Sequence, residues 1–141
     1  MELKFLDTNV ILRFLTKDHP EQSMAALALL EQLADGRLAA TTSESVIVEV
    51  VQVLSSRALY SLSRAEVMKH VRAVLGLKGL KLPGKGIYRA ALDIYSSTNV
   101  DFVDALTAAQ MKRQGIAAIL SFDRHFDRLP GVRREEPKAG Q

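Results

Sequence analysis

The chain has 141 residues, of which 48% are hydrophobic and 25% are charged, a composition typical of a folded globular protein. It has no cysteine, which excludes disulfide bonds and cysteine-bound zinc and fits a reducing cytoplasm. No apolar run reaches the ~18 residues that span a bilayer, and Glu2 and Lys4 interrupt any signal-peptide core, so we expect no membrane association. The net charge of +3 allows an anionic partner such as nucleic acid.

Apolar patterning predicts strands that alternate with helices. Strands are expected at residues 3–7, 37–41, around 80–82, at 116–123 and near the end of 124–134. Helices are expected at residues 9–16, 18–36, 41–58, 61–76, 85–99 and 101–115. We expect a single domain over residues 1–134 and a flexible tail at 135–141.

Capping residues mark the starts of two of these helices. Ser63 and Glu66 have the spacing of a capping box at the fourth predicted helix. At the third predicted helix, Thr41 and Glu44 have the same spacing, and Ser43 is an alternative cap.

Strands that are apolar throughout and alternate with helices indicate a parallel sheet covered by helices on both faces, an α/β sandwich. Ligands of such folds bind beyond the carboxyl ends of the strands. Asp7 ends the first predicted strand, and Ser121 and Asp123 end the strand at 116–123. We therefore expect a functional site at these strand ends.

Four acidic residues stand where a parallel sheet could gather them. Asp7 and Asp123 follow strands, and Asp104 lies in the first turn of a predicted helix. Glu49 falls three residues after Val46 in an apolar helical run, where an unpaired buried carboxylate would be costly. Each acid has an ordinary alternative: the aspartates could cap helices, and Glu49 could reach solvent.

The joint pattern favours a metal site. Asp101 and Asp104 are three residues apart on one helix face, so their charges repel unless a cation or basic group lies nearby. A cluster of carboxylates is typical of Mg²⁺ or Mn²⁺ sites. The sequence therefore predicts a metal centre of Asp7, Glu49, Asp104 and Asp123.

Four stretches, FLDTNVILRFL, SVIVEVVQVL, DFVDALTAA and ILSFDRHF, resemble in order and spacing the acidic motifs of PIN-domain nucleases, most closely the VapC-type toxins of toxin–antitoxin pairs. The resemblance implies a three-layer α/β/α fold with a central, mainly parallel sheet. It also implies a cytoplasmic, Mg²⁺- or Mn²⁺-dependent endoribonuclease that leaves 5′-phosphate and 3′-hydroxyl ends. Such proteins usually form homodimers and are inhibited by a cognate VapB-type antitoxin. The alternative is a PIN-like RNA-binding or RNA-processing protein that is not a toxin.

Under this resemblance each matching residue has an expected role. The metal-binding and catalytic acids are Asp7, Glu49, Asp104 and Asp123, and the supporting residues around them are Thr8, Asn9, Asp101 and Ser121. An acidic site repels RNA, so cations are needed around its rim. The candidates for RNA binding are Arg13, Lys85, Arg89, Lys112, Arg124 and Arg128.

Three other functions compete with this interpretation. A metal-free ribonuclease would need histidine acid–base catalysis, but we expect surface roles for His19 and His70 and a peripheral one for His125. An aspartyl phosphatase would use Asp7 as nucleophile, although Asn9 departs from the D-x-D-x-T pattern typical of such enzymes. A non-catalytic binding module would keep the acids for structure alone.

Overall fold

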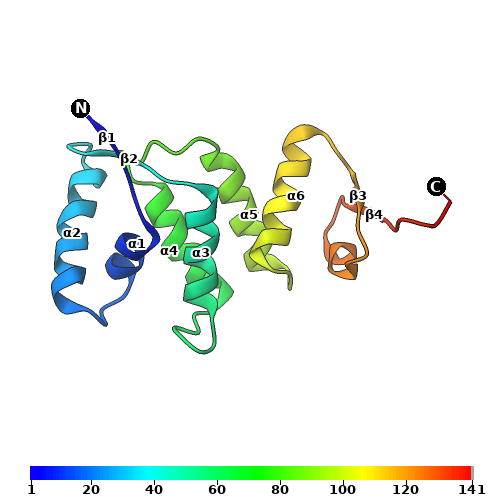
Figure 1. The fold of residues 1–141 in the computed structure, drawn as a ribbon, viewed down its shortest axis with the longest axis horizontal. Coiled ribbons are helices and arrows are strands. Elements are labelled where there is room, and N and C mark those ends of the chain that lie inside the picture. The colour runs from blue at the N-terminus through cyan, green and yellow to red at the C-terminus, as the bar shows by residue number, and fades with distance from the viewer. Residues whose placement is uncertain (141) are drawn as a thin grey trace. The chain divides into compact units, whose positions relative to one another are not determined.

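The computed structural model describes residues 1–140, which form two compact units. The first unit is Met1–Lys85, and the second begins at Gly86. The elements of the first unit are β1 (Leu3–Phe5), α1 (Thr8–Leu15), α2 (Pro20–Ala34), β2 (Ala39–Thr41), α3 (Glu44–Ser55) and α4 (Arg64–Leu75) (Figure 1). Those that follow are α5 (Lys85–Ser97), α6 (Phe102–Gln114), β3 (Ala118–Leu120), the 3₁₀ helix η1 (Arg124–Arg128) and β4 (Arg133–Glu135).

The strands form two parallel pairs, one in each unit. In the first unit β1 pairs with β2, with Leu3 opposite Ala39. The strand predicted around residues 80–82 is reduced to one parallel bridge between Leu80 and Ala40. In the second unit β3 pairs with β4, with Ala118 opposite Arg133. Parallel pairing and the alternation of strands and helices confirm the predicted α/β class.

The core of the first unit is built from its helices. The side chains of Ile11, Leu33, Ile47, Leu54 and Leu75 are at most 1% exposed. Burial of each such side chain is worth about 1.5–3 kcal/mol. The core of the second unit includes Tyr95 and Phe102, whose rings meet edge to face at 5.9 Å between centroids.

The predicted capping box of α4 is confirmed, because Ser63 and Glu66 exchange hydrogen bonds between side chains and backbone. At α3 the alternative cap is the correct one: Ser43 Oγ accepts a hydrogen bond from the backbone N–H of Val46. The Thr41–Glu44 capping box is wrong, because Thr41 belongs to β2.

Two details of the prediction are corrected. The strand at residues 3–7 was expected to be buried, but Leu3 is 55% and Phe5 64% exposed. An apolar run favours a strand, whereas burial also requires elements that cover its faces. The predicted tail at 135–141 begins too early, because β4 ends at Glu135, and its last residue, Gln141, lies outside the described residues.

Within residues 1–140 no helix is long and apolar enough to cross a membrane.

Gly79 fixes the close approach of two backbone segments in the first unit. Its N–H donates to the carbonyl of Leu33 at 2.7 Å, and its carbonyl accepts from the N–H of Ala40 at 2.9 Å. A Cβ atom at this position would lie 2.1 Å from the carbonyl oxygen of Leu38 and 2.9 Å from that of Leu33. Only glycine therefore fits between Leu33 at the end of α2 and the segment from Leu38 to Ala40 that leads into β2.

We predict that Gly79→Ala lowers the free energy of unfolding by at least about 2 kcal/mol, because the clashing atoms are backbone. Gly86→Ala is the matched control. Nothing lies within 4 Å of a Cβ there, and alanine favours the helix by about 1 kcal/mol. Urea unfolding followed by circular dichroism measures both, and equal midpoints for the two variants would contradict the close approach.

Candidate metal centre

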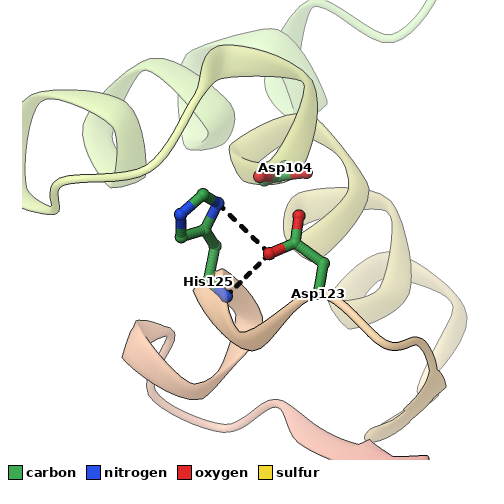
Figure 2. A group of neighbouring side chains, drawn as sticks. All are labelled: Asp104, Asp123 and His125. Atoms are coloured by element: carbon green, nitrogen blue, oxygen red, sulfur yellow. Dashed lines mark hydrogen bonds and ion pairs between the residues drawn. The ribbon is translucent and has the colours of Figure 1, made fainter.

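Three side chains of the second unit face one another at the start of α6 and the turn after β3 (Figure 2). Asp104 lies in the first turn of α6, Asp123 precedes η1, and His125 lies within η1. Each offers a possible ligand atom, and these atoms all lie within 4.8 Å of one another. This group contains two of the four predicted acids, Asp104 and Asp123.

Local hydrogen bonds fix the position of Asp123. Its Oδ1 atom accepts from the backbone N–H of His125 at 2.9 Å, so the residue does cap η1. The same oxygen lies 3.2 Å from Nδ1 of His125. Ser121 Oγ accepts from the backbone N–H of Asp123 at 2.9 Å. The Ser121 hydroxyl therefore contacts the turn that carries Asp123, and its supporting role stays a prediction.

Asp104 is the electrostatically unfavourable member of the group. Partial burial, followed by the carboxylates of Asp123 and Asp101, raises its pKa above the ordinary aspartate value, and His125 opposes this shift. Ionised Asp104 therefore stands in a field that disfavours its charge. Two carboxylates and an imidazole at this spacing fit a divalent cation, which would relieve the repulsion.

Asp101 occupies the N-cap position of α6 in an extended conformation. Its backbone carbonyl accepts from the N–H of Ala105, but among the described residues its carboxylate makes no capping hydrogen bond. The capping alternative therefore does not explain this side chain. Its charge acts on Asp104 instead, consistent with the supporting position predicted for it.

In the first unit, Asp7 follows the end of β1 and is the N-cap residue of α1. The strand end is held by the hydroxyl of Thr42, which donates to the carbonyl of Leu6 at 2.8 Å. Thr8 is buried and Asn9 is exposed. Within the described part of the chain the Asp7 side chain makes no capping hydrogen bond, so capping does not account for this aspartate either.

The surroundings predicted for Glu49 are wrong. The buried face of α3 consists of Ile47, Val50, Val51 and Leu54, and Glu49 is exposed. The apolar stripe is centred one position away from the one that Val46 suggested. The Glu49 side chain is exposed to solvent on α3. Asp7 and Glu49 both belong to the first unit, and their role as metal ligands stays a prediction.

The candidate RNA-binding cations differ in their contacts. Arg13 Nε donates to Gln22 Oε1 at 2.7 Å, and Lys85 Nζ donates to the carbonyl of Leu77 at 3.3 Å. Arg128 Nη1 donates to the carbonyl of Asn99 at 2.7 Å. Of the remaining three candidates, Lys112 and Arg124 are exposed and Arg89 is half-buried.

His125 was expected to be peripheral, yet its ring lies against Asp123. The signal that could have identified His125 is its position two residues after an N-cap aspartate. At this position its backbone N–H donates to the Asp123 carboxylate, which brings the imidazole ring close to the same group.

The fold and the site define an α/β protein with an acidic centre at the carboxyl end of a parallel strand. Residues 4–132 match the family described as PIN domain, and the chain belongs to this family. It is also similar to a VapC ribonuclease of Aquifex aeolicus (strain VF5), with 29% identity over 127 residues, which cover 90% of this chain and 92% of that protein.

We predict that Asp104→Asn raises the melting temperature of the metal-free protein at neutral pH. The folded state holds a proton on Asp104 more tightly than the unfolded chain does. Stability therefore falls as pH rises from the ordinary aspartate pKa through the raised value, and the amide removes this loss. Thermal melts across this pH range, with chelator present, measure the effect.

Asp18→Asn is the control of opposite sign. Hydrogen bonds from Tyr60 and Thr16 lower the pKa of Asp18, so its contribution is present above the ordinary aspartate pKa and is lost as pH falls through the lowered value. Its amide should lower the melting temperature at neutral pH. Parallel pH profiles of Asp104→Asn and the wild type would contradict the repulsion at the centre.

Proposed function

We propose that this protein is a metal-dependent endoribonuclease and the toxin of a toxin–antitoxin pair. The observation that carries the proposal is the pairing of Asp104 with Asp123, whose mutual repulsion a divalent cation would relieve. Membership of the PIN-domain family and the similarity to a VapC ribonuclease support it.

Asp104 and Asp123 would hold the metal ion, Mg²⁺ or Mn²⁺, together with Asp7 and Glu49 of the first unit. Oxygen ligands of this kind suit both ions. A bound ion lowers the pKa of a coordinated water and offsets negative charge on the scissile phosphate. His125 would add a nitrogen beside Asp123.

The remaining residues position these ligands. Ser121 holds the turn at Asp123 through its hydroxyl, and Asp101 adds negative charge beside Asp104. Thr8 and Asn9 are the first two residues of α1 and fix the start of the helix directly after Asp7.

Asp123 and Asp104 would orient the attacking water in line with the leaving 3′-oxygen. The products would then be 5′-phosphate and 3′-hydroxyl ends.

RNA would be bound through its backbone by cations near this centre. Arg124 directly follows Asp123 and is exposed, and Lys112 is exposed on the helix that carries Asp104. Arg89 and Arg128 are further candidates, and Arg13 and Lys85 lie in the first unit. We propose that it acts on RNA in the cytoplasm.

The partners we propose are a VapB-type antitoxin and a second copy of the chain. An apolar groove of about 340 Å³ runs along α1 and α2 and includes Val10, Ala25 and Leu29. A groove of this kind suits an amphipathic helix of a partner protein. Met24 and Leu27 of α2 are exposed and add apolar surface nearby.

The first test is cleavage of small RNA by the pure protein with Mg²⁺ or Mn²⁺. We expect cleavage that excess EDTA stops, and 5′-phosphate ends on the products. Asp7→Asn, Glu49→Gln, Asp104→Asn and Asp123→Asn should each reduce the rate on the order of 100-fold or more. Glu31→Gln, an exposed acid on α2, should cleave at the wild-type rate.

Other outcomes distinguish the competing functions. Cleavage that survives EDTA, leaves cyclic phosphate and is lost in His125→Ala would favour a metal-free histidine mechanism. RNA binding without cleavage under either metal would favour the RNA-binding protein that is not a toxin. A phosphate trapped on Asp7 would favour the phosphatase.

We predict that Arg124→Gln weakens RNA binding and makes it less sensitive to salt. Loss of one phosphate contact should reduce the slope of log affinity against log salt by about 0.7 for single-stranded RNA. Binding is measured by fluorescence anisotropy in an Asp104→Asn background, which prevents cleavage. Arg57→Gln, an exposed arginine after α3, is the matched control and should leave the slope unchanged.

A further inference from the structure

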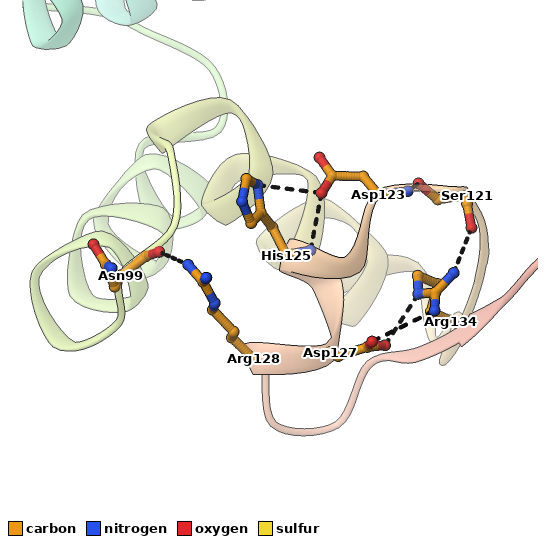
Figure 3. A network of polar contacts seen from close by, with 7 residues as sticks. All are labelled: Asn99, Ser121, Asp123, His125, Asp127, Arg128 and Arg134. Atoms are coloured by element: carbon orange, nitrogen blue, oxygen red, sulfur yellow. Dashed lines mark hydrogen bonds and ion pairs between the residues drawn. The ribbon is translucent and has the colours of Figure 1, made fainter.

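Arg134 of β4 is the least exposed of the arginines that form ion pairs in the second unit within the described residues. Its side chain is 13% exposed, whereas that of its neighbour Arg133 is 69% exposed. Arg133 pairs with Glu135 on the same strand. Arg134 instead reaches into the connection that carries Asp123 (Figure 3). The two adjacent arginines therefore differ in their partners: Arg133 pairs within its own strand, whereas Arg134 contacts the connection between β3 and β4.

The guanidinium of Arg134 makes two separate contacts in this connection. Its Nη1 donates to the backbone carbonyl of Ser121 at 3.1 Å. Its Nε and Nη2 donate to the two carboxylate oxygens of Asp127, at 3.1 and 3.5 Å. Arginine suits this arrangement better than lysine, because its planar guanidinium presents donors in a fixed fork, whereas the lysine ammonium is a compact point charge.

Ser121 and Asp127 are the two ends of the turn that bears the candidate ligands. Asp123 and His125 lie between them, and the Ser121 hydroxyl accepts from the backbone N–H of Asp123. Arg134 therefore closes the turn at both ends, as Figure 3 shows.

The turn needs such a clamp because its own backbone holds it weakly. Parallel strands are usually joined by an α-helical crossover, but β3 and β4 are joined through one short 3₁₀ helix. Such helices have poorer hydrogen-bond geometry than α-helices. The repulsion between Asp123 and Asp104 also acts to separate the turn from α6.

We propose that Arg134 is a positioning residue of the metal centre, which fixes Asp123 and His125 at ligand distance from Asp104. The proposal rests on the metal-dependent activity proposed above and assigns a residue to it beyond the acids. Arg134 does not bind RNA directly, because its donors are engaged by Asp127 and Ser121 and its side chain is largely buried.

The test compares Arg134→Lys and Arg134→Gln with Arg133→Lys and Arg133→Gln. Loss of a group that orients a metal ligand typically costs about 10–100-fold in metal affinity or activity. We expect the Arg134 variants to bind Mn²⁺ about 10-fold or more weakly in titrations followed by electron paramagnetic resonance. At fixed Mn²⁺ their kcat should fall by a similar factor, with KM for RNA within about two-fold of the wild type. The Arg133 variants should match the wild type in all three quantities.

Two further measurements separate positioning from a purely structural role. With Arg134→Lys shown by circular dichroism to be fully folded before Mn²⁺ is added, raising the Mn²⁺ concentration should restore most of its kcat, and that recovery cannot come from refolding of unfolded protein. Asp127→Asn should weaken Mn²⁺ binding in the same direction, and adding Arg134→Gln to it should cost less than the two single effects combined.

Wild-type Mn²⁺ affinity and kcat in a folded Arg134→Gln would overturn the inference. A wild-type protein that binds Mn²⁺ but cleaves no RNA would overturn the proposed function alone, since the Mn²⁺ titration still compares the variants. A wild-type protein that binds no Mn²⁺ would overturn both.

Discussion

The repulsion between the carboxylates of Asp104 and Asp123 is the constraint on which the centre depends. Both side chains are held near each other by elements that fold for other reasons: α6 begins at Phe102, and η1 is capped by Asp123 itself. The start of a helix favours an anion, and the nearby imidazole of His125 opposes the rise in the pKa of Asp104. Burial, followed by the carboxylates of Asp123 and Asp101, outweighs the effect of His125, so the pKa of Asp104 is raised. A bound cation would neutralise the charge of the ionised carboxylates without protonating Asp104.

That constraint explains why polar contacts concentrate in the connection between β3 and β4. A turn that holds a charge against a like charge must be tied by more than its short 3₁₀ helix. Arg134 supplies two of these ties, and the backbone N–H of Ser121 supplies another by donating to the carbonyl of Glu135. The last strand of the described chain, β4, thus contacts the turn that bears Asp123, although it carries none of the candidate metal-binding acids.

Sequence patterns predicted the order of helices, the Ser63–Glu66 capping box and the α/β class, because these depend on contacts between residues close in the chain. They also located Asp104 in the first turn of a helix and Asp123 between a strand and a helical turn, because both positions are local features. They failed where a tertiary contact decides: the exposure of Leu3 and Phe5, and the face of α3 on which Glu49 lies. Arg134 was indistinguishable from Arg133 in sequence, since only the fold shows which of two adjacent strand residues points at the turn.

Asp7 and Asp123 have the same local sequence signal, an aspartate between a strand and a helix, but their side chains make different contacts. Each follows a strand and stands at the N-cap position of a helix, so local chemistry predicts the same cap for both. The Asp123 carboxylate makes that hydrogen bond; among the described residues the Asp7 carboxylate makes no such bond. An aspartate that leaves a helix start uncapped forgoes about 1 kcal/mol that its own side chain could contribute. A ligand role gives a reason for that loss, because a carboxylate bound to its own backbone offers fewer lone pairs to a metal ion. At Asp7 the metal hypothesis therefore explains the side chain better than helix capping does.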